Sequence, residues 1–260
     1  QVLGFGGSGT AADSGNQNGI FGYGYIVGPV SMSNIISNAG VVATDVTGVG
    51  TAVYGVGACE YGGDKGIFGY GNNGSSNIAI THLVSNAGVI GTDVTGVGTV
   101  RYKLAACSYG EDKGIFGFGH PGPLSMTNLV SNTGVVGTDV TGTGTARYEP
   151  AACEYGGDKG IFAYGALWPP TAISNLVSNV GVMASDVAGV GTARSQLAAC
   201  SYGEDKGIFG FGLPYPTITA VTNLVSNTGV IATDTAGVGT ARSYPSATQY
   251  GGDKGIFGYG

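Results

Sequence analysis

Charged residues are scarce in this sequence of 260 residues. Only 10% of the chain is Asp, Glu, Lys or Arg, and the formal net charge is −6. A protein that binds the phosphate backbone of nucleic acid needs a basic patch, so we expect no nucleic-acid partner. The same shortage of basic residues argues against binding to an anionic membrane surface. No apolar run reaches the roughly eighteen residues of a membrane span, so we expect no membrane insertion.

Histidine and tryptophan are also rare, which limits the chemistry of the chain. The two histidines, His82 and His120, lie far apart in the sequence, and no triad pattern surrounds either of them. General acid–base catalysis usually needs such a group, or an unusual carboxylate pair, in a cleft. We therefore expect a protein that is not an enzyme, with no catalytic residues and no cofactor.

Cysteine occurs four times, at Cys59, Cys107, Cys153 and Cys200. The four positions are equivalent in successive sequence repeats, whereas a disulfide framework needs cysteines at complementary positions. We interpret them as small buried apolar residues with free thiols. A metal site is the alternative, but no CxxC pair or neighbouring histidine supports it, so we predict none.

Glycine, in contrast, is abundant and marks an internal repeat. Near-copies of one hexapeptide that ends aromatic-Gly begin at Gly19, Gly66, Gly114, Gly160, Gly207 and Gly255. The copies recur about every 47 residues, a period typical of β-propellers. Single units of this kind cannot bury their own faces and must stack on one another. We therefore expect one domain over residues 1–260.

Each repeat contains four short segments with strand composition. In the third unit these are residues 127–131, 135–140, 151–155 and 160–164. Short connections rich in Gly, Asn and Asp separate them, and no segment has a helical period. The sequence therefore predicts an all-β fold, a β-propeller of four-stranded antiparallel blades.

The run from Thr192 to Gly212 resembles the Kelch repeat. It combines an arginine, a strand of small apolar residues, a Gly-Glu-Asp-Lys turn and an apolar strand that ends in glycines. The arginine recurs as Arg101, Arg147, Arg194 and Arg242. The chain departs from Kelch in having Val53 in the first unit, an aromatic residue between the terminal glycines, and no outer-strand tryptophan. The resemblance implies a propeller whose cysteine strand is innermost and whose Gly-Ile-Phe strand is second. The Asn-Leu-Val-Ser strand is then third, and the segment that follows it is outermost.

The number of blades follows from counting hairpins. The repeat units are residues 25–71, 72–119, 120–165, 166–212 and 213–260, preceded by a partial unit at 1–24. We interpret residues 1–7 as an inner strand and residues 8–18 as a longer turn. The chain then has six inner hairpins and five outer ones, which predicts six blades with an incomplete last blade. Five blades plus a spare hairpin is the alternative, and a third option is that the spare hairpin pairs with another subunit.

Alternate loops of an antiparallel blade lie on opposite faces, and the two sets of loops differ in variability. The Gly-Asp-Lys and Asn-x-Gly turns are nearly invariant, whereas the linkers after each hexapeptide and the connections around each arginine vary. Aromatic residues on proline-stiffened loops suit contacts with a sugar or a protein. The alternative is that these linkers simply tolerate change. The candidate binding residues are Tyr25, Asn73, His120, Trp168, Tyr215, Arg101, Arg147, Arg194 and Arg242.

An aspartate also recurs near the end of each outer segment, as Asp45, Asp93, Asp139, Asp186 and Asp234. A calcium loop needs several oxygen ligands within about a dozen residues, and each repeat offers one carboxylate here. We interpret these aspartates as turn residues or as partners of the recurrent arginines.

The near-perfect repetition leaves little room for a bespoke active site. We expect a non-enzymatic structural or surface assembly protein that presents a propeller scaffold, as in a virion, a fibre or an extracellular surface. The alternative is a lectin-like or protein-binding propeller that uses the variable loop face. The expected partners are other protein subunits, including copies of the chain itself, and a glycan is a second candidate. Because the sequence begins at Gln1 and not at Met, we expect a mature or trimmed chain. We expect the protein at an extracellular or virion surface, and the cytoplasm is the alternative location.

Overall fold

Strands and turns, with no helix, make up the part of the chain that the structure describes. The computed structural model describes residues 3–6 and 17–260, and their strands form six small antiparallel sheets. The prediction of an all-β fold is confirmed. Within the described ranges no helix is long and apolar enough to cross a membrane.

Each sheet begins with a hairpin of two strands, and five sheets add a third. The first strands are β1 (Leu3–Gly6), β4 (Gly57–Tyr61), β7 (Ala105–Tyr109), β10 (Ala151–Tyr155), β13 (Ala198–Tyr202) and β16 (Ser246–Tyr250). The second strands are β2 (Gly19–Tyr25), β5 (Lys65–Gly69), β8 (Lys113–Gly119), β11 (Lys159–Ala163), β14 (Lys206–Gly210) and β17 (Lys254–Gly258). The third strands are β3 (Pro29–Ile36), β6 (Thr81–Val84), β9 (Leu124–Val130), β12 (Ser174–Val177) and β15 (Thr222–Val225).

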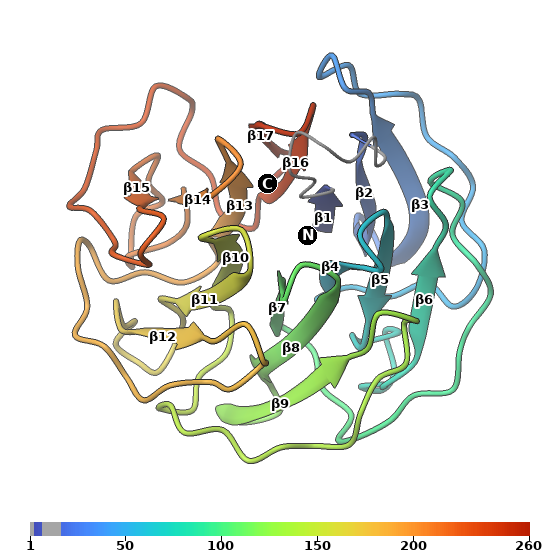
Figure 1. Ribbon diagram of the computed structural model, residues 1–260, viewed down its shortest axis with the longest axis horizontal. Helices are drawn as coiled ribbons and strands as arrows, with labels where there is room; N and C mark the ends of the chain where they lie inside the picture. Colours follow the sequence, from blue (N-terminus) through green and yellow to red (C-terminus); the bar gives the residue numbers. More distant parts are fainter. Residues whose placement is uncertain (1–2, 7–16) are drawn as a thin grey trace.

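The six sheets lie in chain order around a common centre (Figure 1). The first strand of each sheet lies against the first strand of the next, and β16 of the last sheet lies against β1 of the first. The cysteine strands are therefore innermost, the Gly-Ile-Phe strands second and the Asn-Leu-Val strands third, in the order predicted. Strand β1 agrees with the inner strand expected at residues 1–7. Most of the longer turn expected at residues 8–18 lies outside the described residues.

The prediction of four regular strands in each sheet is wrong, because the outermost segment forms only two isolated bridges. In the third sheet these bridges join Thr127 to Val140 and Val130 to Val136. Between them, the Asn128 side chain donates hydrogen bonds to the Gly137 carbonyl at 3.0 Å and to the Asp139 carboxylate at 2.9 Å. A side chain thus takes over the part of the ladder that a regular fourth strand would supply.

The last sheet is the smallest. It consists of β16 and β17 alone, and no strand within residues 3–6 and 17–260 pairs with the outer edge of β17. The described chain therefore holds six inner hairpins and five third strands, as the hairpin count predicts. The sequence repeats are offset from the sheets, because each unit supplies the outer strand of one sheet and the inner hairpin of the next.

Both faces of the second strands are largely buried in the first five sheets, since each of these sheets packs between two neighbours, whereas β17 of the last sheet is partly exposed. Successive residues of a strand point to opposite faces, yet Ile161 and Phe162 of β11 are both fully buried. One core cluster joins Cys107 and Ile115 of the third sheet to Phe162 and Val177 of the fourth. No sheet therefore has a core of its own, and the hydrophobic core consists of the contacts between sheets.

The recurrent cysteines and glycines are explained by this packing. The sulfur of Cys107 in one sheet lies where a Cβ atom on Gly160 of the next sheet would be, at 2.6 Å. Cys153 and Gly207 form the same contact at 2.5 Å. The four cysteines are free and buried, as predicted, and burial raises the pKa of the Cys200 thiol to about 12. Each cysteine is thus a small apolar knob that fits against a glycine.

Truncation of one core phenylalanine should weaken the whole ring. Replacement of the fully buried Phe209 by Ala should lower the free energy of unfolding by about 3–5 kcal/mol, because the cavity would lie between two sheets. Urea denaturation measures the change. The fully exposed Val238→Ala variant should change the stability by less than about 0.5 kcal/mol. Equal stabilities for the two variants would contradict the packing of Phe209.

Candidate functional site

Three of the arginines expected on the binding face are buried instead, and for them that prediction is wrong. Arg101, Arg147 and Arg194 have an exposed fraction of 0%. Their guanidinium groups lie over the rings of Tyr70, Phe118 and Tyr164 at 4.0, 3.9 and 4.2 Å from the ring centroids. Each ring belongs to the preceding sheet, so the arginine fills the junction between two sheets and is not available to a ligand. Arg242 is half-buried and lies 5.2 Å from the centroid of Phe211.

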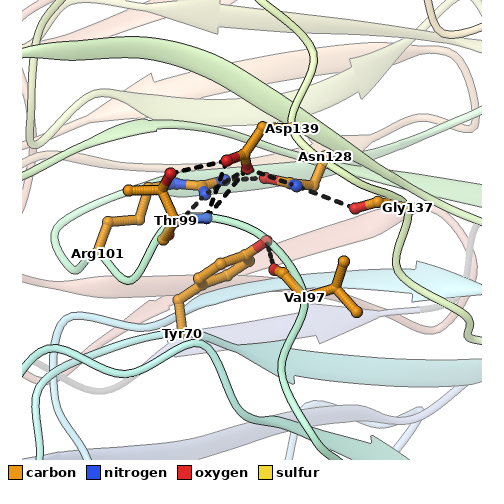
Figure 2. Close-up of polar contacts among 7 residues, drawn as sticks. All are labelled: Tyr70, Val97, Thr99, Arg101, Asn128, Gly137 and Asp139. Carbon is orange, nitrogen blue, oxygen red and sulfur yellow. Dashed lines mark hydrogen bonds and ion pairs between the residues drawn. The ribbon is translucent and has the colours of Figure 1, made fainter.

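Figure 2 shows the polar partners of the buried Arg101. Its Nη2 donates to Asn128 Oδ1 at 2.6 Å, and its Nη1 donates to the Thr99 carbonyl at 3.3 Å. The Asp139 carboxylate lies 3.9 Å away and accepts a hydrogen bond of 2.7 Å from the Thr99 hydroxyl. A buried charge needs partners of this kind. We call the group of Thr, Arg, Asn and Asp a latch, because it ties the connection before a sheet to the outer strands of that sheet.

The Thr–Asp part of the latch recurs around the ring, whereas the Arg–Asn hydrogen bond is present at Arg101 and Arg194 but not at Arg147. The Thr hydroxyl to Asp carboxylate pairs are Thr51–Asp93, Thr99–Asp139, Thr145–Asp186 and Thr192–Asp234. The first of them differs, because Val53 replaces the arginine and His82 replaces the asparagine. The His82 ring lies 4.7 Å from the Tyr23 ring and bonds Asp93 at 2.7 Å, so it occupies the space of the missing guanidinium. The aspartates are thus latch residues, and the predicted pairing with arginine applies to Asp139 directly.

The remaining candidates lie at the surface or close to it. Tyr25, Trp168 and Tyr215 are exposed, Trp168 to 63%. Asn73 is exposed as well, and its Oδ1 accepts hydrogen bonds from the backbone of Ser75 and Ser76, which closes its own turn. His120 is half-buried, and its pKa is lowered by burial and by the nearby charge of Lys103.

Four of these candidates, unlike Asn73, belong to an arc of aromatic rings on the variable face. Neighbouring ring centroids along the arc are 4.9–5.8 Å apart, and the pairs are Tyr25–Tyr54, Tyr54–Tyr102, Tyr102–His120, His120–Tyr148 and Trp168–Tyr215. Trp168 Nε1 donates to the Tyr148 hydroxyl at 3.1 Å and joins the last pair to the others. Backbone bridges, such as Tyr102 to His120, hold the linkers beside the connections. Linkers and connections therefore share one face, as predicted.

The arc leads to a cavity of about 160 Å³ whose polar groups the sequence analysis did not select. Its lining includes Lys103, Glu149, Gln196, Tyr244, Trp168 and Tyr215. Lys103 Nζ lies 2.7 Å from Glu149 Oε1, and the Tyr244 hydroxyl donates to the same oxygen at 2.5 Å. Burial, with the charge of Glu149 as the second cause, raises the pKa of the Tyr244 phenol well above its usual value. The phenol therefore remains a neutral hydrogen-bond donor at physiological pH.

Four of the polar side chains that line the cavity come from one repeated backbone position. Gly55, Lys103, Glu149, Gln196 and Tyr244 each lie two residues after the arginine or its replacement, and all have a positive φ of 54–64°. The Lys103 amide donates to the Gly55 carbonyl at 2.7 Å, and the Glu149 amide donates to the Lys103 carbonyl at 2.8 Å. Equivalent residues of successive repeats therefore meet at one end of the ring. The sequence signal was available, since five nearly identical repeats carry five different residues here.

The cavity suits a small neutral group. A cavity of about 150 Å³ admits a benzene molecule, so this one has room for a single six-membered ring. Aromatic rings supply apolar walls, while Gln196, Tyr244 and the Lys103–Glu149 pair supply hydrogen-bonding groups. The opposite charges of Lys103 and Glu149 offset each other, which favours an uncharged ligand.

Neither a metal-binding group nor a known family identifies the function of this chain. Within the described part of the chain, no group of three or more His, Cys, Asp or Glu side chains could hold a metal ion. Neither a scan against protein-family models nor a search of curated protein sequences finds a match for this chain.

The latches should make the stability of the fold sensitive to acid. Burial disfavours ionisation of Asp234, but hydrogen bonds from Thr192 and Asn223 and the charge of Arg194 outweigh it and lower its pKa. The latch therefore stabilises the fold above about pH 4, and this contribution is lost as the pH falls through the folded-state pKa. We expect Asp234→Asn to be less stable than the unmodified chain at pH 7, with the difference shrinking towards pH 3 in urea titrations.

The matched control for this titration is Asp253→Asn, which removes a carboxylate from an exposed turn. It should leave the stability nearly unchanged at both pH values. A stability difference for Asp234→Asn that is the same at pH 7 and pH 3 would contradict the role of the ionised carboxylate.

Proposed function

We propose that this chain is a non-enzymatic, lectin-like binding module with a Kelch-like β-propeller architecture. In this proposal, a neutral monosaccharide, free or at the end of a glycan, binds in the cavity next to Lys103 and Glu149. The observation that carries the proposal is the convergence of five different residues, from one repeated position, at one end of a ring that is otherwise nearly symmetric. Function on a repeated scaffold depends on such individual positions.

The propeller architecture is supported by the arrangement of the sheets. Six antiparallel sheets surround one centre, and their innermost strands contact one another around the full circle. The strand order and the arginine-containing connections agree with the Kelch pattern. Propellers offer their loop faces and the ends of their central channel as binding sites, and the cavity occupies such a place.

A saccharide fits the cavity better than an apolar or ionic ligand does. A sugar ring has C–H faces that pack on aromatic side chains and hydroxyl groups that need donors and acceptors. Trp168 and Tyr215 lie edge to face at 4.9 Å and form an apolar wall. Glu149 accepts hydrogen bonds, while Lys103 and Tyr244 donate them. The cavity therefore offers both kinds of contact within the size of one ring.

Binding without catalysis is supported by the acid groups of the cavity. Hydrolysis of a glycosidic bond usually needs two carboxyl groups on either side of the bond. Among the residues that line the cavity, Glu149 is the sole carboxylate, and it forms an ion pair with Lys103. A bound sugar would thus be recognised and released unchanged.

Fluorescence of Trp168, the single tryptophan of the chain, provides the test. Titration with a panel of neutral monosaccharides should give a saturable change in emission for at least one member, because Trp168 lines the cavity. Replacement of Glu149 by Gln should weaken that binding about tenfold, since a hydrogen bond to a charged group is lost.

The control for this replacement is Glu111→Gln. Glu111 lies exposed in a turn of the opposite, invariant face, so its replacement should leave the affinity unchanged. If no member of the panel changes the emission, or if Glu149→Gln binds like the unmodified chain, the proposal of a saccharide site is wrong.

A second candidate function is a structural or assembly role at a virion, fibre or extracellular surface. The observation that favours it is the two-stranded last sheet, whose outer edge has no partner within the described residues. Such an edge can accept a strand from another chain. In this role the partners are protein subunits, and the cavity is incidental.

A further inference from the structure

The outer edge of β17 differs from the same edge in the other five sheets. In those sheets, the second strand pairs with a third strand; in the fifth sheet, Phe209 lies opposite Asn223 and Ile208 opposite Leu224. The equivalent Phe257 and Ile256 of β17 have no such neighbour among the described residues, and both are partly exposed. An edge strand with unpaired backbone groups and exposed apolar side chains is a template for strand addition.

The residues that would hold a third strand are nevertheless present. Thr240 and Arg242 occupy the positions that Thr192 and Arg194 occupy in the fifth sheet. There, Thr192 donates to the Asp234 carboxylate and Arg194 Nη2 donates to Asn223 Oδ1 at 2.7 Å. At the last sheet, Arg242 Nη1 donates to the Tyr259 carbonyl at 3.0 Å, and no Asn or Asp side chain of the described residues meets it. The Thr and Arg of a latch are thus present at the last sheet, whereas the described residues supply no Asn or Asp to complete it.

The first sheet, which neighbours the last sheet, carries the opposite half of a latch, namely the Asn and the Asp. Its Asn34 donates to Asp45 at 2.8 Å, as the latch asparagines do. The Oδ1 atom of Asn34, whose counterparts in Asn128 and Asn223 accept from an arginine, accepts from the Tyr259 hydroxyl of the last sheet at 2.8 Å. The last sheet therefore has an incomplete latch on each side. Among the described residues, the latch at Arg242 lacks the Asn and Asp of an outer segment, and the latch at Asn34 lacks the Thr and Arg of a connection.

We propose that the edge of β17 is an acceptor site for an outer-strand segment donated by another protein chain. The donor would add a third strand antiparallel to β17 and would place an Asn beside Arg242. An Asp eleven residues further on would reach Thr240. Residues 219–236 of this chain have this pattern, with Asn223 and Asp234. The proposal is separate from the saccharide site, because neither Thr240 nor Arg242 lines the cavity, although Tyr244 of the cavity follows Arg242 in the same connection.

A second copy of this chain does not fit the site as well as a dedicated donor does. The five outer segments of each copy already pair within their own sheets. Among the described strands, the second strand left unpaired on its outer edge in a second copy is β17, whose sequence Lys254-Gly-Ile-Phe-Gly258 has neither Asn nor Asp. Pairing of two β17 edges would leave Thr240 and Arg242 of both copies without their carboxylate and amide partners.

The test is the binding of a fluorescent peptide of residues 219–236 to the whole chain, measured by anisotropy. We expect saturable binding, together with slower hydrogen exchange of the β17 amides, because the added strand pairs with them. A control peptide with Asn223→Ala and Asp234→Ala should bind at least about tenfold more weakly, since its hydrogen bonds to Thr240 and Arg242 are lost. Replacement of Arg242 by Met in the protein should weaken the unmodified peptide to a similar extent.

Lys113→Met is the matched protein control, since it removes one positive charge from an exposed turn of the third sheet. It should leave peptide binding unchanged. The proposal is overturned if the peptide does not bind, if the control peptide binds equally well, or if Arg242→Met has no effect. A dimer of the chain in light scattering that excludes the peptide would also overturn it, and would assign the edge to a second copy. Loss of saccharide binding alone would leave this result unaffected.

Discussion

The packing of each sheet against its two neighbours is the constraint on which the rest of the structure depends. The sheets are too small to bury a face by themselves, so the core exists only where two sheets meet. At the centre, where the sheets converge, Cys153 of one strand leaves no room for a Cβ atom on Gly207 of the next, because that atom would lie 2.5 Å from the sulfur. Further out, the contact is made by an arginine that lies over an aromatic ring and donates a hydrogen bond to the carbonyl of the latch threonine. Repetition of both contacts accounts for the repetition of the sequence.

Function is expected where this repetition fails. A residue engaged in the core or in a latch cannot vary without a loss of stability, whereas the position two residues after each arginine is free to do so. There the chain carries Lys103, Glu149, Gln196 and Tyr244, and they line one cavity. The last sheet breaks the repetition differently, because Arg242 is retained but no third strand of this sheet lies among the described residues. The two asymmetric features support two separate proposals, a ligand site and a strand-acceptor site.

Much of the fold could be predicted from the sequence, because hairpins and buried strands depend on local patterns. The hexapeptide repeat predicted the six inner hairpins, and the equivalence of the cysteines predicted free, buried thiols. The fourth strand was predicted wrongly. Side chains such as Asn128 replace its backbone hydrogen bonds, and these contacts form between residues that are distant in the sequence. Burial of Arg101 depends on Tyr70 of another sheet, which strand periodicity does not reveal. The cavity was missed for the same reason, because Lys103 and Glu149 meet only when the ring forms.

A double-mutant cycle at the centre of the ring tests this account most directly. A methyl group added at Gly207 would overlap the Cys153 sulfur, because its carbon would lie 2.5 Å from that atom, whereas its other neighbours would lie at 3.4 Å. Gly207→Ala should therefore destabilise the chain strongly in urea denaturation, and Cys153→Ala in the same chain should restore much of the lost stability. If the two replacements simply add, so that the double variant is less stable than either single one, the contact between sheets described for these residues is wrong.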